Sequence, residues 1–151
     1  MRSFTNVIDI DAPAHDVFVA LRSVDGYAAW LRHSMVYRGT RTPAHPADAS
    51  PPTYEDSTMI GRMRGELLEE RRDRELRFHQ AKRSGRVDAL IVYRVANSGD
   101  RTTVTRVGEL TTHGIYRMVE PVFVRMASTE SARTMRALKA HVEREVPSKG
   151  A

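Results

Sequence analysis

The sequence contains no cysteine, which excludes disulfide bridges and thiolate chemistry and favours a reducing compartment such as the cytoplasm. Long hydrophobic runs are also missing. No stretch approaches the roughly 20 apolar residues of a membrane-spanning helix, and no apolar run precedes Asp9, so we expect no signal peptide. These absences predict a cytoplasmic protein that does not insert into a membrane.

Lysine is scarce, with 3 residues against 21 arginines, and the net charge is +5. A basic surface can bind nucleic acid. The arginines, however, are spread along the chain among 19 acidic residues, so no basic stripe is evident. We interpret the densest cationic group as the solvated ends of two predicted turns, and we expect no nucleic-acid partner. This group comprises Arg71, Arg72, Arg74, Arg77, Lys82, Arg83 and Arg86.

The motifs of several enzyme classes are absent from the sequence. There is no Gly-x-Ser-x-Gly nucleophile elbow, no glycine-rich phosphate-binding loop and no dinucleotide fingerprint. The six histidines lie in separate segments, without the paired spacing of metal ligands. The sequence therefore predicts neither a cofactor nor a metal site.

The longest periodic segment runs from Ile115 to Glu145 and predicts one amphipathic helix, because its apolar residues recur at helical spacing. Pro121 should bend the first turns, since proline removes a backbone hydrogen bond. We expect the apolar stripe to face a cavity between Met118 and Met126 and to pack in a core from Met135 onward.

Seven segments have the alternating pattern of β-strands and are separated mostly by short breaks. Two short helices are expected between the first and the second. Short connections force neighbouring strands to be antiparallel, and a long antiparallel sheet curls, so that a helix can lie across its concave side. The predicted strands are residues 4–10, 35–40, 54–59, 62–70, 75–83, 87–96 and 102–112.

The segment from Arg41 to Pro52 is predicted to be a loop, because it is rich in proline, alanine, aspartate and serine. A loop of this length in a compact domain often covers a binding site. A tolerated insertion is an equally good explanation, and the sequence does not separate the two.

Three stretches resemble a known family. They are Ile8–Pro13 with Val17-Phe18, Gly65–Glu69 with Arg74–Phe78, and Glu120-Pro121 with Leu138-Lys139. They are similar to the opening strand and helix, the central hairpin and the closing helix of the SRPBCC (START/Bet v 1-like) superfamily, in its polyketide cyclase/dehydrase-like branch. The resemblance implies an α+β helix-grip fold, in which a seven-stranded curved antiparallel sheet wraps a long C-terminal helix. We expect residues 1–151 to form one such domain, ordered from about residue 3 to 145 and followed by a short tail.

The resemblance also implies a deep, mostly apolar pocket between the sheet and the long helix. We therefore predict a protein that binds a hydrophobic small molecule of the lipid, polyketide or aromatic type. Two alternatives stay open: a polyketide aromatase/cyclase or dehydratase that acts on such a ligand, and an interaction module that uses its basic surface. Both a monomer and a homodimer are compatible with the sequence.

Strand and helix periodicity predicts which residues line the pocket. For Trp30 a core role is the better explanation, and methionines spread over a core are more often filler. The predicted ligand-binding residues are Trp30, Tyr37, Tyr54, Met63, Phe78, Gln80, Ile91, Tyr93, Arg106, Met118, Val122, Phe123 and Met126.

Arg106, Tyr93 and Glu66 are the candidate catalytic residues. A buried guanidinium is costly unless it is paired, so an inward Arg106 would seek a ligand oxygen. A register shift of one residue would instead place Arg106 in solvent. Arg64 and Glu66 are either a solvated ion pair or, if they point inward, an acid/base pair suited to enolisation and dehydration.

Overall fold

The computed structural model describes residues 2–42 and 53–145. Most of the predicted loop 41–52, and the tail after residue 145, lie outside the described residues. The elements in chain order are β1 (Arg2–Ile10), α1 (Ala14–Arg22), the 3-10 helix η1 (Val24–Ala29), β2 (Tyr37–Arg41), β3 (Thr53–Thr58), β4 (Gly61–Arg71), β5 (Glu75–Lys82), β6 (Val87–Ser98), β7 (Arg101–Thr112), α2 (Ile115–Met118) and α3 (Glu120–Glu145).

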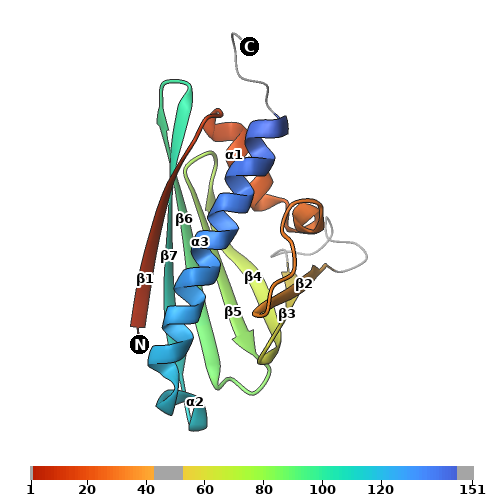
Figure 1. Ribbon diagram of the computed structural model, residues 1–151, viewed down its shortest axis with the longest axis vertical. Coiled ribbons are helices and arrows are strands. Elements are labelled where there is room, and N and C mark those ends of the chain that lie inside the picture. Colours follow the sequence, from red (N-terminus) through yellow and green to blue (C-terminus); the bar gives the residue numbers. More distant parts are fainter. Residues whose placement is uncertain (1, 43–52, 146–151) are drawn as a thin grey trace.

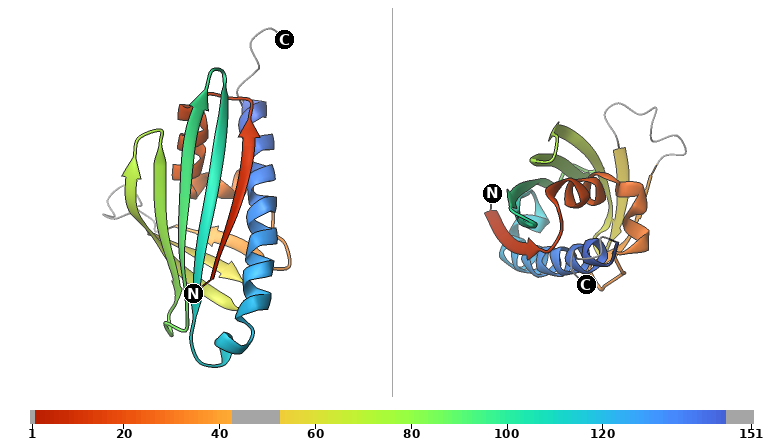
Figure 2. Two further views of the ribbon diagram at one scale, coloured as in Figure 1. Left: turned by 90° about the vertical axis from the view of Figure 1, so that its left-hand side faces the viewer. Right: turned by 90° about the horizontal axis from the view of Figure 1, so that it is seen from above.

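The seven strands form one antiparallel sheet in the order β1-β7-β6-β5-β4-β3-β2, with α3 lying across it (Figure 1). Every neighbouring pair except β1 and β7 is consecutive in the chain, as the short connections require. The predicted helix-grip architecture is confirmed. The sheet curls strongly, and α3 closes its open side (Figure 2).

Polar contacts hold α3 to both sides of this opening. On the side of β1, the Lys139 ammonium donates to the Asp9 carbonyl at 2.9 Å. On the other side, the Arg133 guanidinium donates to the Arg32 carbonyl at 2.9 Å, in the segment that leads into β2. The helix therefore bridges two distant parts of the sheet.

The C-terminal helix differs from the prediction at its start. It is divided at Val119, whose φ and ψ angles are −106° and 7°. Pro121 lies in the first turn of α3, where a missing N–H costs no intrahelical hydrogen bond. The first turns are separated from the long helix, as expected, but the break lies at Val119 and not at Pro121: proline starts the long helix, and the short helix α2 precedes it.

The main core lies between the sheet and the second half of α3. Helix α1 contributes an apolar face that fills the space between them (Figure 2). Burying these side chains supplies most of the favourable free energy of folding. The most deeply buried members of this core are Ile10, Val17, Leu21, Leu76, Val104, Met135 and Leu138.

Candidate functional site

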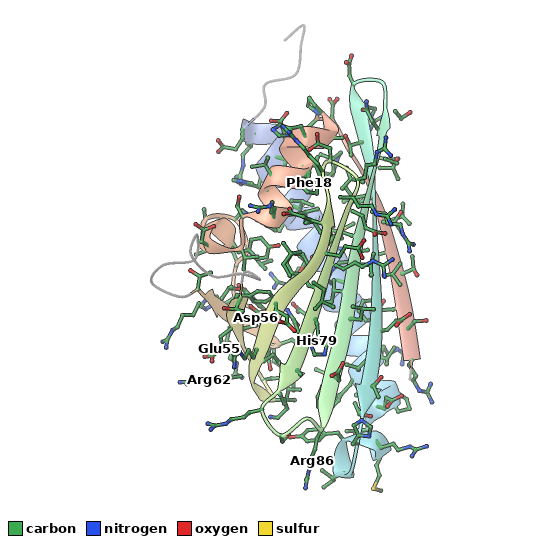
Figure 3. All side chains as sticks on the ribbon, turned by 180° about the vertical axis from the view of Figure 1, so that it is seen from behind. Phe18, Glu55, Asp56, Arg62, His79 and Arg86 are labelled. Carbon is green, nitrogen blue, oxygen red and sulfur yellow. The ribbon has the colours of Figure 1, made fainter. Side chains whose placement is uncertain are left out.

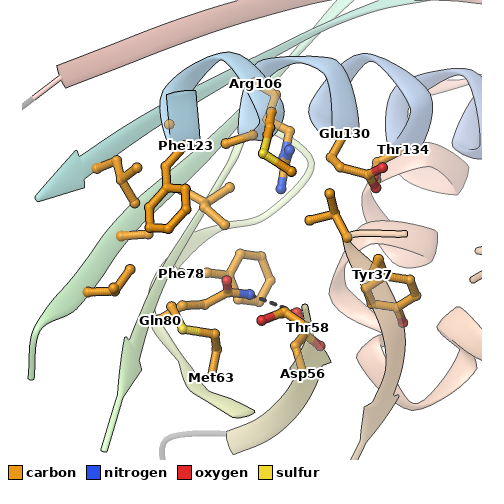
Figure 4. A pocket seen from close by; sticks show the side chains of 18 of the residues that line it. Tyr37, Asp56, Thr58, Met63, Phe78, Gln80, Arg106, Phe123, Glu130 and Thr134 are labelled. Atoms are coloured by element: carbon orange, nitrogen blue, oxygen red, sulfur yellow. Dashed lines mark hydrogen bonds between the residues drawn. The ribbon is translucent and has the colours of Figure 1, made fainter. Parts of the chain in front are cut away.

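A cavity of about 210 Å³ lies between the sheet and the first half of α3. Its walls are mostly apolar, and they come from both layers of the fold (Figure 4). Phe78 and Ile91 contribute from the sheet, while Phe123, Met126 and Ala127 contribute from α3. An apolar cavity with a few polar groups is the usual form of a small-molecule site.

The structure brings most of the predicted ligand-binding residues to this cavity. Because strand alternation is a local property, it placed the sheet residues on the correct face. The predicted residues that line the cavity are Tyr37, Tyr54, Met63, Phe78, Gln80, Ile91, Tyr93, Arg106, Phe123 and Met126.

Trp30, Met118 and Val122 do not line the cavity. The Trp30 ring is buried against Tyr27, with ring centroids 4.9 Å apart, so its alternative role as a core residue applies. Met118 and Val122 are 83% and 56% exposed. Met118 was misplaced because the prediction continued one helical period through residue 119, where the helix is broken. Val122 lies within α3 but directly before Phe123, so it is turned about 100° away from the face that lines the cavity.

Two glycines allow aromatic rings to lie flat against the strands of the cavity wall. A Cβ atom on Gly65 would lie 2.2 Å from Cζ of Tyr54, and one on Gly108 would lie 2.2 Å from Cζ of Phe4. Both distances are far inside van der Waals contact. The rings of Tyr54 and Phe4 therefore take the space that a side chain at these positions would need.

Asp56 is a cavity residue that the sequence analysis missed. Its carboxylate accepts hydrogen bonds from Thr40 Oγ1 at 2.7 Å and from Gln80 Nε2 at 3.0 Å. The same Gln80 nitrogen lies 2.7 Å from the Tyr54 hydroxyl. The alternation of Tyr54, Asp56 and Thr58 along β3 was a signal that could have identified this residue.

Burial raises the pKa of Asp56 to about 6, because the charged form loses its hydration. The hydrogen bonds from Thr40 and Gln80 and the charge of Arg106 oppose this rise. Burial also raises the pKa of Tyr54. The site therefore combines a neutral phenol with a carboxyl group that titrates close to neutral pH.

Arg106 points into the cavity, so the inward register is the correct alternative (Figure 4). Its guanidinium carbon lies 5.3 Å from the ring centroid of Tyr93, which is the residue opposite it in β6. Its Nε atom is buried and has no hydrogen-bond partner among the described residues. An unsatisfied buried donor is costly, and a ligand oxygen would satisfy it.

Glu66 lies on the outer face of the sheet, so its candidate catalytic role is contradicted. Its carboxylate is 3.8 Å from Nδ1 of His79, and neighbouring Arg64 is exposed. The inward residues of β4 are instead Met63 and Gly65. Of the two alternatives for Arg64 and Glu66, the outward placement is therefore correct and the inward acid/base pair is wrong, because these two positions alternate with the buried ones.

The fold is shared with several solved structures that differ widely in sequence. TTHA0849 from Thermus thermophilus is 13% identical, with a TM-score of 0.76 over 95% of this chain and 99% of that chain. A START superfamily protein from Mycobacterium smegmatis is 12% identical, with a TM-score of 0.73 over 95% and 99%. The di-domain ARO/CYC StfQ of the steffimycin biosynthetic pathway is 11% identical, with a TM-score of 0.74 over 95% of this chain and 51% of that chain.

At these identities the likeness establishes the fold alone. No protein of curated function matches the chain. The model of one sequence family, described as polyketide cyclase/dehydrase and lipid transport, matches residues 1–143. The chain therefore belongs to the polyketide cyclase/dehydrase and lipid transport family, and it shares the fold of a START superfamily protein.

Proposed function

We propose that the protein binds a hydrophobic small molecule, of the lipid, polyketide or aromatic type, in the cavity between the sheet and α3. The observation that carries this proposal is the composition of the cavity, whose apolar walls enclose a few convergent polar groups. Such a cavity excludes water from an apolar ligand while selecting for the position of its polar atoms.

The polar groups suggest how the ligand lies. The unpartnered Nε of Arg106 favours a ligand oxygen, such as a carbonyl, a phenolate or a carboxylate. Asp56 and Gln80 lie across the cavity from Arg106 (Figure 4) and are hydrogen-bonded to each other. Gln80 also donates to the Tyr54 hydroxyl, so these three residues form a second polar group. A ligand with an apolar body and an oxygen directed at Arg106 fits this arrangement best.

A thermal-shift series with fatty acids, flavonoids and polyketide mimics tests the proposal. A bound ligand should raise the melting temperature in proportion to ln(1 + [L]/Kd). Ala127→Phe, which places a ring in the cavity, should abolish this shift. Ala140→Phe is the matched control, because Ala140 lies on the same helix and is exposed. The absence of any stabilisation across the series, or equal shifts in the two variants, would contradict the proposal.

A second candidate function is polyketide cyclisation or dehydration, and Asp56 is the observation that favours it. General acid–base catalysis is most efficient when the pKa of the group lies near the working pH, and the pKa of Asp56 is about 6. In this function Arg106 would polarise a ligand carbonyl, while Asp56 would move a proton on the carbon next to it.

Turnover of a poly-β-ketone mimic tests this second function. Asp56→Asn should lower kcat by about 10²- to 10⁴-fold, since the amide cannot exchange the proton. Glu66→Gln is the control, because Glu66 lies outside the cavity, and it should keep full activity. If the unmodified protein shows no turnover, or if the Asp56→Asn variant turns over the mimic as fast as the unmodified protein, the second function is contradicted and ligand binding is left as the function.

A further inference from the structure

Helix α2 lies at one end of the molecule (Figure 1), and large apolar side chains are exposed there. Ile115 and Met118 in α2 are 70% and 83% exposed. Val119, between the two helices, and Val122, in the first turn of α3, are 41% and 56% exposed. We call these four residues the α2 tip. A cluster of this kind on a short protruding helix has no packing role within the described part of the chain.

Cationic side chains surround the α2 tip. Arg117 lies within α2, and Arg2 lines the same surface groove as Met118 and Arg117. Arg86 projects at this end of the molecule (Figure 3), and its backbone carbonyl accepts a hydrogen bond from His113, just before α2, at 2.8 Å. Lys82 lies 5.6 Å from the ring centroid of Tyr116.

The groove beside the α2 tip contains fewer carboxylates than cations. Glu120 is the one carboxylate of the groove that Arg2 and Met118 line. It accepts a hydrogen bond from Thr112 and lies 3.6 Å from Arg2. The tip is therefore apolar at its apex and positively charged around it.

We propose that the α2 tip is a docking site for the surface of an anionic phospholipid membrane. Apolar side chains on a protruding helix can enter the interfacial region, while the surrounding cations contact the lipid phosphates. None of the described helices is long and apolar enough to cross a bilayer.

Other partners fit this surface less well. A second copy of the chain would bring the same cations face to face, and four side chains are few against the roughly 800 Å² that each partner of a stable dimer buries. Nucleic acid would neutralise the cations but would leave the apolar side chains in water. A lipid surface satisfies both features at once.

The inner side of α2 connects the docking site to the cavity. The ring centroid of Tyr116 lies 5.9 Å from that of Phe123. Tyr116 also packs against a small apolar cluster of Met63, Val87 and Leu110, all of which line the cavity. Docking through the α2 tip would therefore place this end of the cavity toward the lipid. In this orientation the cavity could exchange its ligand with the membrane. That exchange rests on the proposed function, whereas docking itself does not.

Flotation with lipid vesicles tests the docking site. The protein should float with vesicles of phosphatidylcholine mixed with phosphatidylglycerol, but not with phosphatidylcholine alone, and added salt should weaken the binding. The double variant Ile115→Gln, Met118→Gln should lower the partition coefficient by at least about tenfold, because less apolar surface leaves the water. The matched control is Val7→Thr, Leu68→Gln, which alters two exposed apolar residues on β1 and β4 and should bind as the unmodified protein does.

A charge variant sharpens the test. Arg86→Gln, Arg117→Gln should lower the partition coefficient by about 30-fold, since each cation near an anionic surface contributes about fivefold. The proposal is overturned if the unmodified protein does not float with the mixed vesicles, or if the Ile115, Met118 variant floats as well as the control. A different result would assign the tip to a second copy of the chain: the unmodified protein sediments as a dimer and does not bind vesicles, and the Ile115, Met118 variant sediments as a monomer. The ligand thermal shift in the same variant separates failure of docking from failure of ligand binding.

Discussion

The two ends of the interior differ in how closely their side chains are packed, although the same sheet and the same helix enclose both ends. Around the second half of α3, Met135 and Leu138 are completely or almost completely buried, and α1 fills the space between helix and sheet. Around the first half, Met126 and Phe123 face a cavity. We call these regions the packed end and the hollow end.

The difference shows how this fold separates stability from binding. The packed end is closed by apolar contacts, whereas the hollow end collects the inward polar groups Asp56, Gln80 and Arg106. Polar groups that lack full hydrogen-bonding partners destabilise a core but prepare a site for a ligand. Substitutions at the two ends should therefore have different consequences.

The largest contrast is expected from the same substitution at both ends. Met135→Ala should lower the free energy of unfolding by about 3 kcal/mol, because it leaves a void in close packing. Met126→Ala should cost less than about 1.5 kcal/mol, since this side chain already borders a cavity. Urea denaturation of both variants measures the difference. Equal losses would contradict the division into two ends.

The hollow end should also respond to pH through Asp56. The pKa of this carboxyl in the folded protein is about 6, above the ordinary value of 3.8. Its stabilising contribution is therefore complete below about pH 4 and is lost as the pH rises through 6. Between about pH 4 and pH 7 the free energy of unfolding should therefore fall by up to roughly 3 kcal/mol more in the unmodified protein than in the Asp56→Asn variant, which has no carboxyl group to ionise at this position. Denaturation of both proteins across this range measures the effect, and parallel curves would show that Asp56 titrates normally.

A smaller loss is expected where the wall of the cavity depends on glycine. Gly65→Ala should destabilise the protein by about 1–3 kcal/mol, because the new Cβ displaces the Tyr54 ring. Gly26→Ala is the control, since no atom lies within 4 Å of the added Cβ. It should be neutral or stabilising by up to about 1 kcal/mol. Thermal denaturation compares the two, and a harmless Gly65→Ala would mean that the ring has free space.

The smallest effect is expected from the surface of the packed end. The Nε atom of Arg22 in α1 donates to Glu70 of β4 at 2.6 Å, but both side chains are largely exposed. Arg22→Gln should cost less than about 0.5 kcal/mol, and salt should reduce this cost further, because solvent screens exposed ion pairs. Thermal denaturation at low and high salt measures it. A loss as large as that of Met135→Ala would show that packing does not dominate there.

Most of the secondary structure could be predicted because its signals are local. The alternation from Leu76 to Gln80 and the periodicity after Met135 depend only on neighbouring residues. The break at Val119 could not be predicted in this way, since an apolar period continues through it. The wrong placement of Met118 follows from continuing that period across the break, whereas Val122 lies on the outer face of α3.

The polar part of the site needed more than local patterns. The two faces of β6 are both apolar, so the sequence could not decide whether Arg106 points inward. Asp56 was overlooked because an aspartate in a strand ordinarily faces solvent, and only the burial of β3 gives it an unusual pKa. Glu66 was proposed although its neighbours Gly65 and Leu67 are the buried ones.

The sequence by itself determined the order of strands and helices, the antiparallel connections and the family resemblance, since all of these are written in short stretches of chain. The tertiary structure alone decided where the interior stays hollow, which polar side chains meet there and which apolar side chains remain in solvent at α2. These features depend on how far α3 stands from the sheet and on where its first turn breaks. The first of these is set by contacts between residues distant in the sequence, which no local period records.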